Sequence, residues 1–184
     1  AFRSNRDGPS RIYVKNVDSA ALTPIASGPH DVPGSWTPDG KEFAFVDVEF
    51  GKSTLSYDIY VTALASPNQS RPVVSTPPAE GYPEFSPDGR WLAYGSDEPG
   101  RDEVFVQPYP GPGKRVQISI GGGNEPAWSR NGKELFYRSV EGSMLSVRFT
   151  ASNAEFIPEK PVVLFTWNFA TGGIARLYDV GPDG

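Results

Sequence analysis

Residues 35–40 of the chain are Ser-Trp-Thr-Pro-Asp-Gly, and this hexapeptide indicates the fold class because it recurs along the sequence. Related hexapeptides stand at residues 84–89 (Glu-Phe-Ser-Pro-Asp-Gly), 127–132 (Ala-Trp-Ser-Arg-Asn-Gly) and 179–184 (Asp-Val-Gly-Pro-Asp-Gly). Their final glycines, at positions 40, 89, 132 and 184, are 43 to 52 residues apart. A period of about 40 to 50 residues is typical of arrays in which each repeat is one small antiparallel sheet.

The Pro-Asp-Gly core of the hexapeptide predicts a tight turn. Proline presets φ at the second turn position, aspartate bonds to nearby backbone, and glycine takes a positive φ without steric cost. We expect the turn to join the first, inner strand of each repeat to its antiparallel neighbour. An aromatic residue stands at one position just before the turn (Trp36, Phe85, Trp128), so we expect it to pack between adjacent sheets rather than stack on a ligand.

Short strand patterns follow each turn. Second strands are expected at residues 42–46, 91–94 and 134–137, third strands at 58–61, 103–106 and 144–149, and fourth strands at 71–74, 115–118 and 161–165. Alternating apolar and polar residues between turn signals are the signature of strands, and no segment of ten or more residues has a helical period. The sequence therefore predicts an all-β fold, a β-propeller of four-stranded antiparallel blades in four repeats.

The two ends of the chain match different parts of one repeat. Residues 1–8 resemble a second strand and its loop, residues 11–14 a third strand and residues 22–25 a fourth, whereas residues 176–180 supply only a first strand. We therefore expect a single domain, 1–184, with blades at about 30–78, 79–122 and 123–173, and a closing blade shared between 1–29 and 174–184. Such sharing removes unpaired strand edges. A closed four-bladed ring, a part of a larger propeller and an eight-bladed homodimer all remain open.

The repeats resemble those of TolB-type, WD-repeat-like propellers. The resemblance rests on residues 36–41 (Trp-Thr-Pro-Asp-Gly-Lys), 85–90 (Phe-Ser-Pro-Asp-Gly-Arg) and 4–8 (Ser-Asn-Arg-Asp-Gly), and on the Ile-Tyr-Val strands at 12–14 and 59–61. Residues 121–137, together with 178–184, are similar to the last blades of propellers fused to bacterial serine/threonine kinases. The resemblance implies a propeller that usually has six or more blades. It also implies a role as a periplasmic interaction protein, a sensor-like domain or a peptidase gating domain.

Composition excludes several classes of site and partner. With no cysteine and one histidine, His30, the chain has no disulfide, no thiolate nucleophile and no zinc site made of cysteines or several histidines. His30 is also the only base that a Ser-His-Asp triad could use, and no Gly-x-Ser-x-Gly motif accompanies it. The net charge of −5 with no basic face argues against nucleic acid as a partner. No apolar run approaches the roughly 20 residues of a membrane span.

The connections that lead into the inner strands are the predicted ligand-binding site, because they are expected to meet at the rim of the central channel. The candidate residues are His30, Asp31, Glu80, Tyr82, Asn124, Glu125, Arg176 and Tyr178. Mixed charge with two tyrosines suits a peptide or a polar small molecule. The loops after the second strands carry further carboxylates, which could hold Ca²⁺, but no calcium-loop spacing occurs. We therefore expect solvated loop acids and no cofactor, with a divalent ion such as Ca²⁺ in the channel or on the loop face as the alternative.

The repeat leaves no room for a separate catalytic domain, so the sequence favours a non-catalytic, protein- or ligand-binding module that acts as a monomer or homodimer. Two alternatives remain open. One is a hydrolase or lyase in which Asp31, Glu80 and Glu125 hold a divalent ion in the channel. The other is a structural fragment of a larger propeller. The compartment is not determined by the residues themselves, and the family resemblance favours a periplasmic or other extracytoplasmic location.

Overall fold

The computed structural model describes residues 1–19, 21–26, 28–49, 56–152, 155–167 and 175–181. All regular secondary structure within these residues is β-strand, and no helix occurs there, as the alternating patterns predict. The strands are β1 (Phe2–Ser4), β2 (Arg11–Lys15), β3 (Leu22–Ala26), β4 (Val32–Trp36), β5 (Glu42–Glu49), β6 (Ser56–Ala63), β7 (Ser66–Val74), β8 (Glu80–Phe85), β9 (Trp91–Ser96), β10 (Glu103–Pro108), β11 (Val116–Gln117), β12 (Asn124–Trp128), β13 (Glu134–Arg138), β14 (Ser143–Ala151), β15 (Phe156–Pro158) and β16 (Val162–Thr166).

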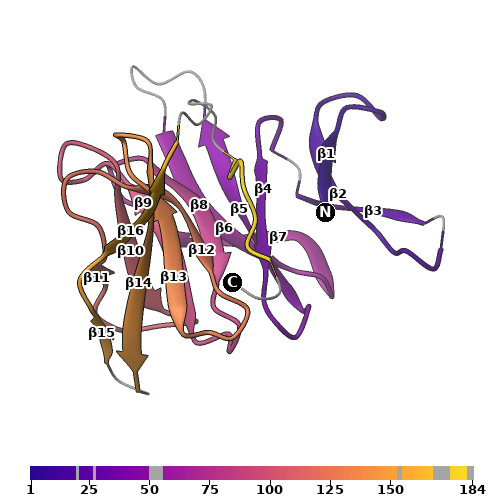
Figure 1. Cartoon of the computed structure of the whole chain (residues 1–184). Helices are drawn as coiled ribbons and strands as arrows, with labels where there is room; N and C mark the ends of the chain where they lie inside the picture. Colours follow the sequence, from indigo (N-terminus) through magenta and orange to yellow (C-terminus); the bar gives the residue numbers. More distant parts are fainter. Residues whose placement is uncertain (20, 27, 50–55, 153–154, 168–174, 182–184) are drawn as a thin grey trace.

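The described strands form four antiparallel sheets, which follow one another across the molecule in Figure 1. Strands β1–β3, β4–β7 and β8–β11 are meanders, in which each strand pairs with the next one in sequence. The last sheet begins in the same way with β12–β14, and both β15 and β16 then pair with β14. This succession of small antiparallel sheets agrees with the predicted propeller architecture.

The three recurring hexapeptides at residues 35–40, 84–89 and 127–132 fold into the turn that their residues predict. In the copy before β9, the Ser86 hydroxyl donates to Asp88 Oδ1 at 2.6 Å and accepts the Trp91 N–H at 3.0 Å. The Gly89 N–H reaches the Ser86 carbonyl at 2.9 Å, and Gly89 has a φ of +72°. The same bonds form around Thr37, Asp39 and Gly40 and around Ser129, Asn131 and Gly132. Hydrogen bonds between residues that are close in sequence thus stabilise the turn, so the turn can be predicted from the sequence.

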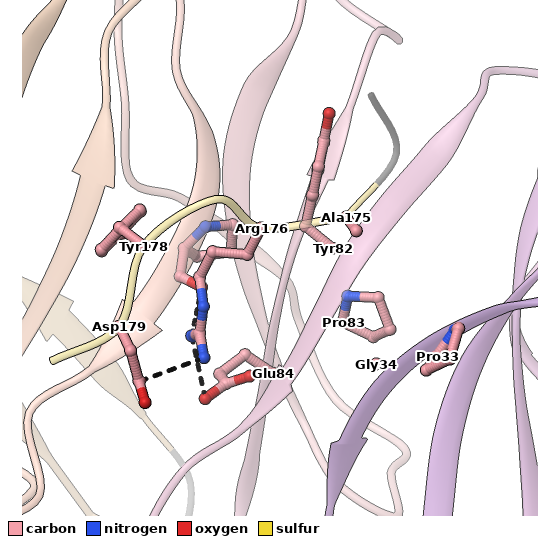
Figure 2. A pocket seen from close by; sticks show the side chains of 10 residues that line it. Pro33, Gly34, Tyr82, Pro83, Glu84, Ala175, Arg176, Tyr178 and Asp179 are labelled. Carbon is pink, nitrogen blue, oxygen red and sulfur yellow. Dashed lines mark hydrogen bonds and ion pairs between the residues drawn. The ribbon is translucent and has the colours of Figure 1, made fainter. Parts of the chain in front are cut away.

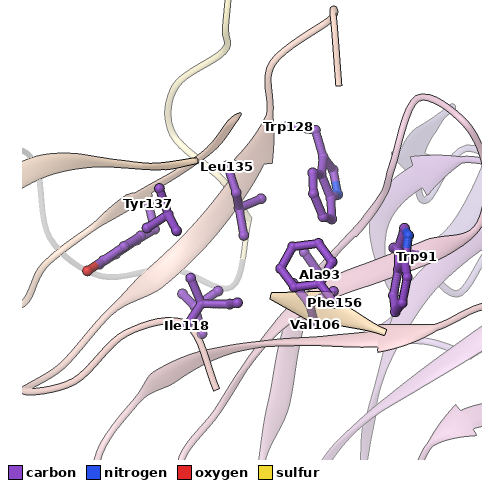
Figure 3. Packing of buried hydrophobic residues seen from close by; sticks show 10 residues of the cluster. Trp91, Ala93, Val106, Ile118, Trp128, Leu135, Tyr137 and Phe156 are labelled. Carbon is purple, nitrogen blue, oxygen red and sulfur yellow. The ribbon is translucent and has the colours of Figure 1, made fainter. Parts of the chain in front are cut away.

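The aromatic residues before these turns pack between neighbouring sheets, as expected. Trp128 is 5% exposed and lies in one cluster with Trp91 and Val106 of the preceding sheet and Leu135 of its own sheet (Figure 3). Its indole N–H also donates to the Glu84 carbonyl at 3.0 Å. Phe85 lies in the equivalent cluster between the second and third sheets, and Trp36 packs against the cluster between the first and second.

The C-terminal segment differs from the prediction. Residues 176–180 were expected to pair with the N-terminal strands as the first strand of a shared blade. In the structure the described residues 175–181 belong to no strand, and the sheet β1–β2–β3 contains no fourth strand among the described residues. The physical reason is that the polar groups of this segment bond to β8 and β12 instead. The predicted turn at residues 182–184 lies outside the described residues.

Candidate functional site

A cavity of about 270 Å³ lies where the first strands of three sheets meet the C-terminal segment. We call it the inner-strand pocket; Figure 2 shows the C-terminal segment running along one side of it. Strand β4 contributes Pro33 and Gly34, and strand β12 contributes Pro126. The remaining lining residues are Tyr82, Pro83 and Glu84 of β8 and Ala175, Arg176, Tyr178 and Asp179 of the C-terminal segment.

The strands that line this pocket are bent by bulges. The pairing register shifts between Gly81 and Glu84 in β8, and a comparable shift occurs in β4 and β12. Tyr82 and Glu125 have φ values of 56° and 54°, the left-handed region that side chains other than glycine rarely adopt. Such strain costs on the order of 1–3 kcal/mol and concentrates at functional sites. A bulge also changes the direction in which the side chains near it leave the strand.

Glu125 is a buried carboxylate with two bonded partners on different elements. Its Oε1 accepts a hydrogen bond from Arg138 Nη1 of β13 at 2.8 Å, and both residues are 5% exposed. Its Oε2 accepts the backbone N–H of Leu177 at 2.9 Å. Because the buried guanidinium fixes one oxygen, the second oxygen is held ready to accept a backbone N–H from an extended segment.

The C-terminal segment is held by further polar contacts. The Arg176 guanidinium lies 3.1 Å from Glu84 Oε1 and 3.5 Å from Asp179 Oδ1, and it donates to the Pro126 carbonyl at 3.4 Å (Figure 2). The Tyr178 hydroxyl donates to the Glu125 carbonyl at 2.6 Å. Burial raises the pKa of Glu84 and the charge of Arg176 opposes that shift. The pocket therefore offers acceptors for a cation, a backbone N–H and a phenol.

A second cavity of about 250 Å³ lies beside Glu80 and Tyr82. Glu80 is 1% exposed and accepts hydrogen bonds from the hydroxyl and the backbone N–H of Thr76. Burial raises the pKa of Glu80 and raises that of Tyr82 to about 12. Asp97 and Asp102 complete the acidic lining. Within the described part of the chain, no group of three or more histidine, aspartate or glutamate side chains is placed to hold a metal ion.

The other predicted rim residues lie outside both cavities. His30 is half-buried in the turn between β3 and β4. Asp31 is 2% exposed and accepts the Gly28 N–H at 2.8 Å, and burial together with the nearby Asp47 charge raises its pKa to about 7. Asn124 hydrogen-bonds to Asp102.

The structure therefore brings together four of the eight predicted residues, Tyr82, Glu125, Arg176 and Tyr178, around the inner-strand pocket. Glu80 joins Tyr82 at the second cavity, while His30, Asp31 and Asn124 lie apart from both.

Sequence reasoning missed two charged residues that line the pocket, Glu84 and Asp179, and also Arg138, which pairs with Glu125. Glu84 and Asp179 each stand at the first position of a recurring hexapeptide, 84–89 and 179–184. The recurrence of a carboxylate at this position could have indicated that both residues belong to the site. Arg138 stands at the end of an apolar strand, and its pairing with Glu125 depends on the register of β12 and β13. No pattern in the sequence indicates that register.

Comparisons with known proteins agree with this architecture. The family model described as the TolB beta propeller domain matches residues 1–161. The structure of a putative TolB from Agrobacterium tumefaciens has a TM-score of 0.66 at 18% identity, over 86% of this chain and 59% of that one. For TolB from Acinetobacter baumannii the TM-score is 0.60 at 17% identity, over 86% of this chain and 40% of that one.

A puromycin-hydrolyzing peptidase from Mycobacterium tuberculosis matches with a TM-score of 0.61 at 17% identity, over 93% of this chain and 29% of that one. At such identities the similarity shows the fold alone, and the chain spans less than two thirds of each of these three structures. No curated protein matches the sequence. The described residues include no helix that is long and apolar enough to cross a membrane. From the family model, which covers most of the sequence, the chain belongs to the TolB beta propeller domain family.

Proposed function

We propose that this chain is a non-catalytic binding module whose inner-strand pocket takes an extended segment of a protein or peptide. The observation that carries the proposal is the way strands β8 and β12, which line the pocket, already bind residues 175–181. Glu84 contacts the Arg176 guanidinium, Glu125 Oε2 accepts the Leu177 N–H, and a backbone carbonyl accepts the Tyr178 hydroxyl. These are the contacts by which proteins recognise peptides, namely main-chain hydrogen bonds combined with positions for particular side chains.

An immobilised library of short random peptides tests this function with the full chain as the probe. We expect a subset of peptides to bind, and we expect Glu84→Gln to weaken that binding about tenfold, which corresponds to about 1.4 kcal/mol. Lys133→Ala is the matched control, because Lys133 is exposed on the turn at the far end of β12. Binding that is unchanged by Glu84→Gln would place the peptides elsewhere on the surface and contradict the proposal.

A carboxylate-dependent hydrolase or lyase is the weaker alternative. Each of its three proposed carboxylates already has an internal partner: Asp31 the Gly28 N–H, Glu80 the Thr76 hydroxyl, and Glu125 the Arg138 guanidinium. These contacts favour structural roles, and a Ca²⁺ or other divalent ion in the channel stays a proposal. A stability scan with EDTA, Ca²⁺ and Mn²⁺ tests for the ion, since a bound metal raises the melting temperature.

The number of blades also remains a proposal. We propose blades at about 30–78, 79–122 and 123–173, with residues 1–29 belonging to a further blade. Association of the last sheet with another copy or with further chain is supported by its strand β16, whose Val162, Val163, Leu164 and Phe165 are each about half exposed or more. Light scattering distinguishes a monomer of 20.0 kDa from a dimer, and Leu164→Lys is expected to abolish a dimer that forms through this edge.

We also propose an extracytoplasmic location, which rests on the resemblance of the repeats to TolB-type propellers. Fractionation of cells that express the protein from its complete gene tests this location. The resemblance of residues 121–137 to kinase-fused propellers stays a prediction.

A further inference from the structure

The C-terminal segment forms one side of the inner-strand pocket and is bound to the strands there by side-chain contacts rather than as part of a sheet. Residues 175–181 lie in no strand, yet three successive residues, Arg176, Leu177 and Tyr178, each make a polar contact with β8 or β12. Figure 2 shows the segment along one side of the pocket with the Arg176 guanidinium directed at Glu84. This arrangement defines what the pocket accepts.

The contacts assign three adjacent subsites. The first is a cation subsite, formed by Glu84 Oε1 at 3.1 Å and the Pro126 carbonyl at 3.4 Å from the Arg176 guanidinium. The second is Glu125 Oε2, which accepts a main-chain N–H at 2.9 Å. The third is the Glu125 carbonyl, which accepts a phenolic hydroxyl at 2.6 Å. An arginine followed two residues later by a tyrosine satisfies all three.

The protein side of the pocket is prepared for such a ligand. The side chains of Glu84 and Arg176 are only about one-fifth exposed, so loss of the cation would leave a largely desolvated carboxylate without its partner. Glu125 is fixed by Arg138, and its backbone is set in a left-handed conformation at φ 54° ahead of Pro126. A pre-organised acceptor loses little conformational freedom on binding.

The segment belongs to no sheet and is held mainly by polar contacts. Leu177 is 54% exposed and the Asp179 side chain 81% exposed, whereas the Arg176 side chain is 23% exposed and Tyr178 is half-buried. A partner segment that offers the same cation, backbone N–H and phenol can form the same hydrogen bonds in its place. The cavity of about 270 Å³ beside it gives a competing segment room to enter.

We propose that residues 175–181 are an internal pseudo-ligand, and that the pocket is selective for an extended partner segment of the form Arg-x-Tyr, which binds by displacing them. The proposal rests on the proposed function and deepens it, because it names the ligand class and the internal competitor. A partner with this pattern makes the same three contacts, and its affinity is lowered by whatever free energy the internal segment contributes.

A labelled heptapeptide with the sequence of residues 175–181, Ala-Arg-Leu-Tyr-Asp-Val-Gly, tests the proposal by fluorescence anisotropy. The protein is the full chain and its Arg176→Ala/Tyr178→Phe variant, in which the internal segment loses two of its three contacts. We expect the variant to bind the peptide at least tenfold more tightly than the unmodified chain. Adding Glu84→Gln to the variant is expected to reverse most of that gain.

Two controls make the result specific. Arg130→Ala removes an exposed arginine from the turn after β12 and is expected to leave the affinity unchanged. A scrambled heptapeptide is expected to bind neither chain. Equal binding of the heptapeptide to the unmodified chain and the variant, or equal binding of the scrambled peptide, would overturn the proposal. Thermal unfolding of each variant confirms that it is folded.

The outcomes also separate this inference from the proposed function. If peptides from the random library bind and respond to Glu84→Gln, but the heptapeptide does not bind the double variant, then the binding function stands and the Arg-x-Tyr inference is wrong. If neither the library nor the heptapeptide binds, both are wrong.

Discussion

Glu125 of β12 and Arg138 of β13 form an ion pair of 2.8 Å in which both side chains are 7% exposed. The pair joins the first two strands of the last sheet, and it also fixes the carboxylate that holds the C-terminal segment. A buried ion pair contributes little net stability compared with apolar residues, but removing one partner leaves an uncompensated charge.

We therefore expect Arg138→Met to lower the free energy of unfolding by about 3–5 kcal/mol, measured by urea denaturation. Arg148→Met is the matched control, because Arg148 pairs with Glu134 at 2.9 Å but its side chain is 74% exposed. Such a surface pair contributes only about 0–1 kcal/mol. Equal losses from the two substitutions would show that the Glu125–Arg138 pair is not desolvated in solution.

Trp128→Ala tests the packing between the third and fourth sheets. The substitution removes a buried ring from the cluster that also contains Trp91 and Leu135, and it removes the bond to the Glu84 carbonyl. The expected loss of stability is about 3–5 kcal/mol. Trp167→Ala is the control, since Trp167 is 69% exposed, and an unchanged melting temperature for Trp128→Ala would contradict the packing.

Gly89→Ala tests the turn. Gly89 has a φ of +72°, and an added Cβ would lie 3.3 Å from Pro38 Cδ. Because a left-handed conformation costs an L-residue about 1–2 kcal/mol, we expect a loss of stability of that size. Gly81→Ala is the control, with open space around its Cβ position and no positive φ. If Gly89→Ala cost no more stability than Gly81→Ala in β8, the turn at Gly89 would not have the conformation described.

The titration of Asp31 makes the free energy of unfolding depend on pH. Burial and the neighbouring Asp47 charge raise its pKa to about 7, while the Gly28 N–H and Arg3 act in the opposite direction. A carboxyl whose pKa is higher in the folded than in the unfolded state binds its proton more tightly when folded. Its contribution therefore favours folding below the unfolded pKa of about 4 and declines as pH rises to about 7.

Asp31→Asn removes this titration while keeping an oxygen that accepts the Gly28 N–H. We expect the variant to be more stable than the unmodified chain at pH 8, with the difference vanishing near pH 4. Denaturation curves at intervals of one pH unit measure it, and a difference that does not change with pH would contradict the burial of a charged Asp31.

Much of the architecture was predictable from the sequence because the determinants are local. The turn around Gly89 depends on bonds between residues no more than five positions apart, such as Ser86 with Trp91, and the strand patterns reflect alternation along a single strand. The recurring aromatic before each turn likewise predicted packing between sheets, because the same position in every repeat faces the same neighbour.

The residues that meet at the candidate site are known only from the tertiary structure. The segment 176–180 has the pattern of an inner strand, yet its polar groups bond to Glu84 and Glu125, which lie roughly 50 to 90 residues away in sequence. Arg138 meets Glu125 through the register of two strands, and the left-handed backbone of Tyr82 and Glu125 arises from bulges. Local residue pattern thus determined the turns and strands of this protein. The site depends on contacts between segments that are distant in sequence. The free energy of these contacts outweighs the local preference of a segment for a strand, and they produce no repeating residue pattern in the sequence.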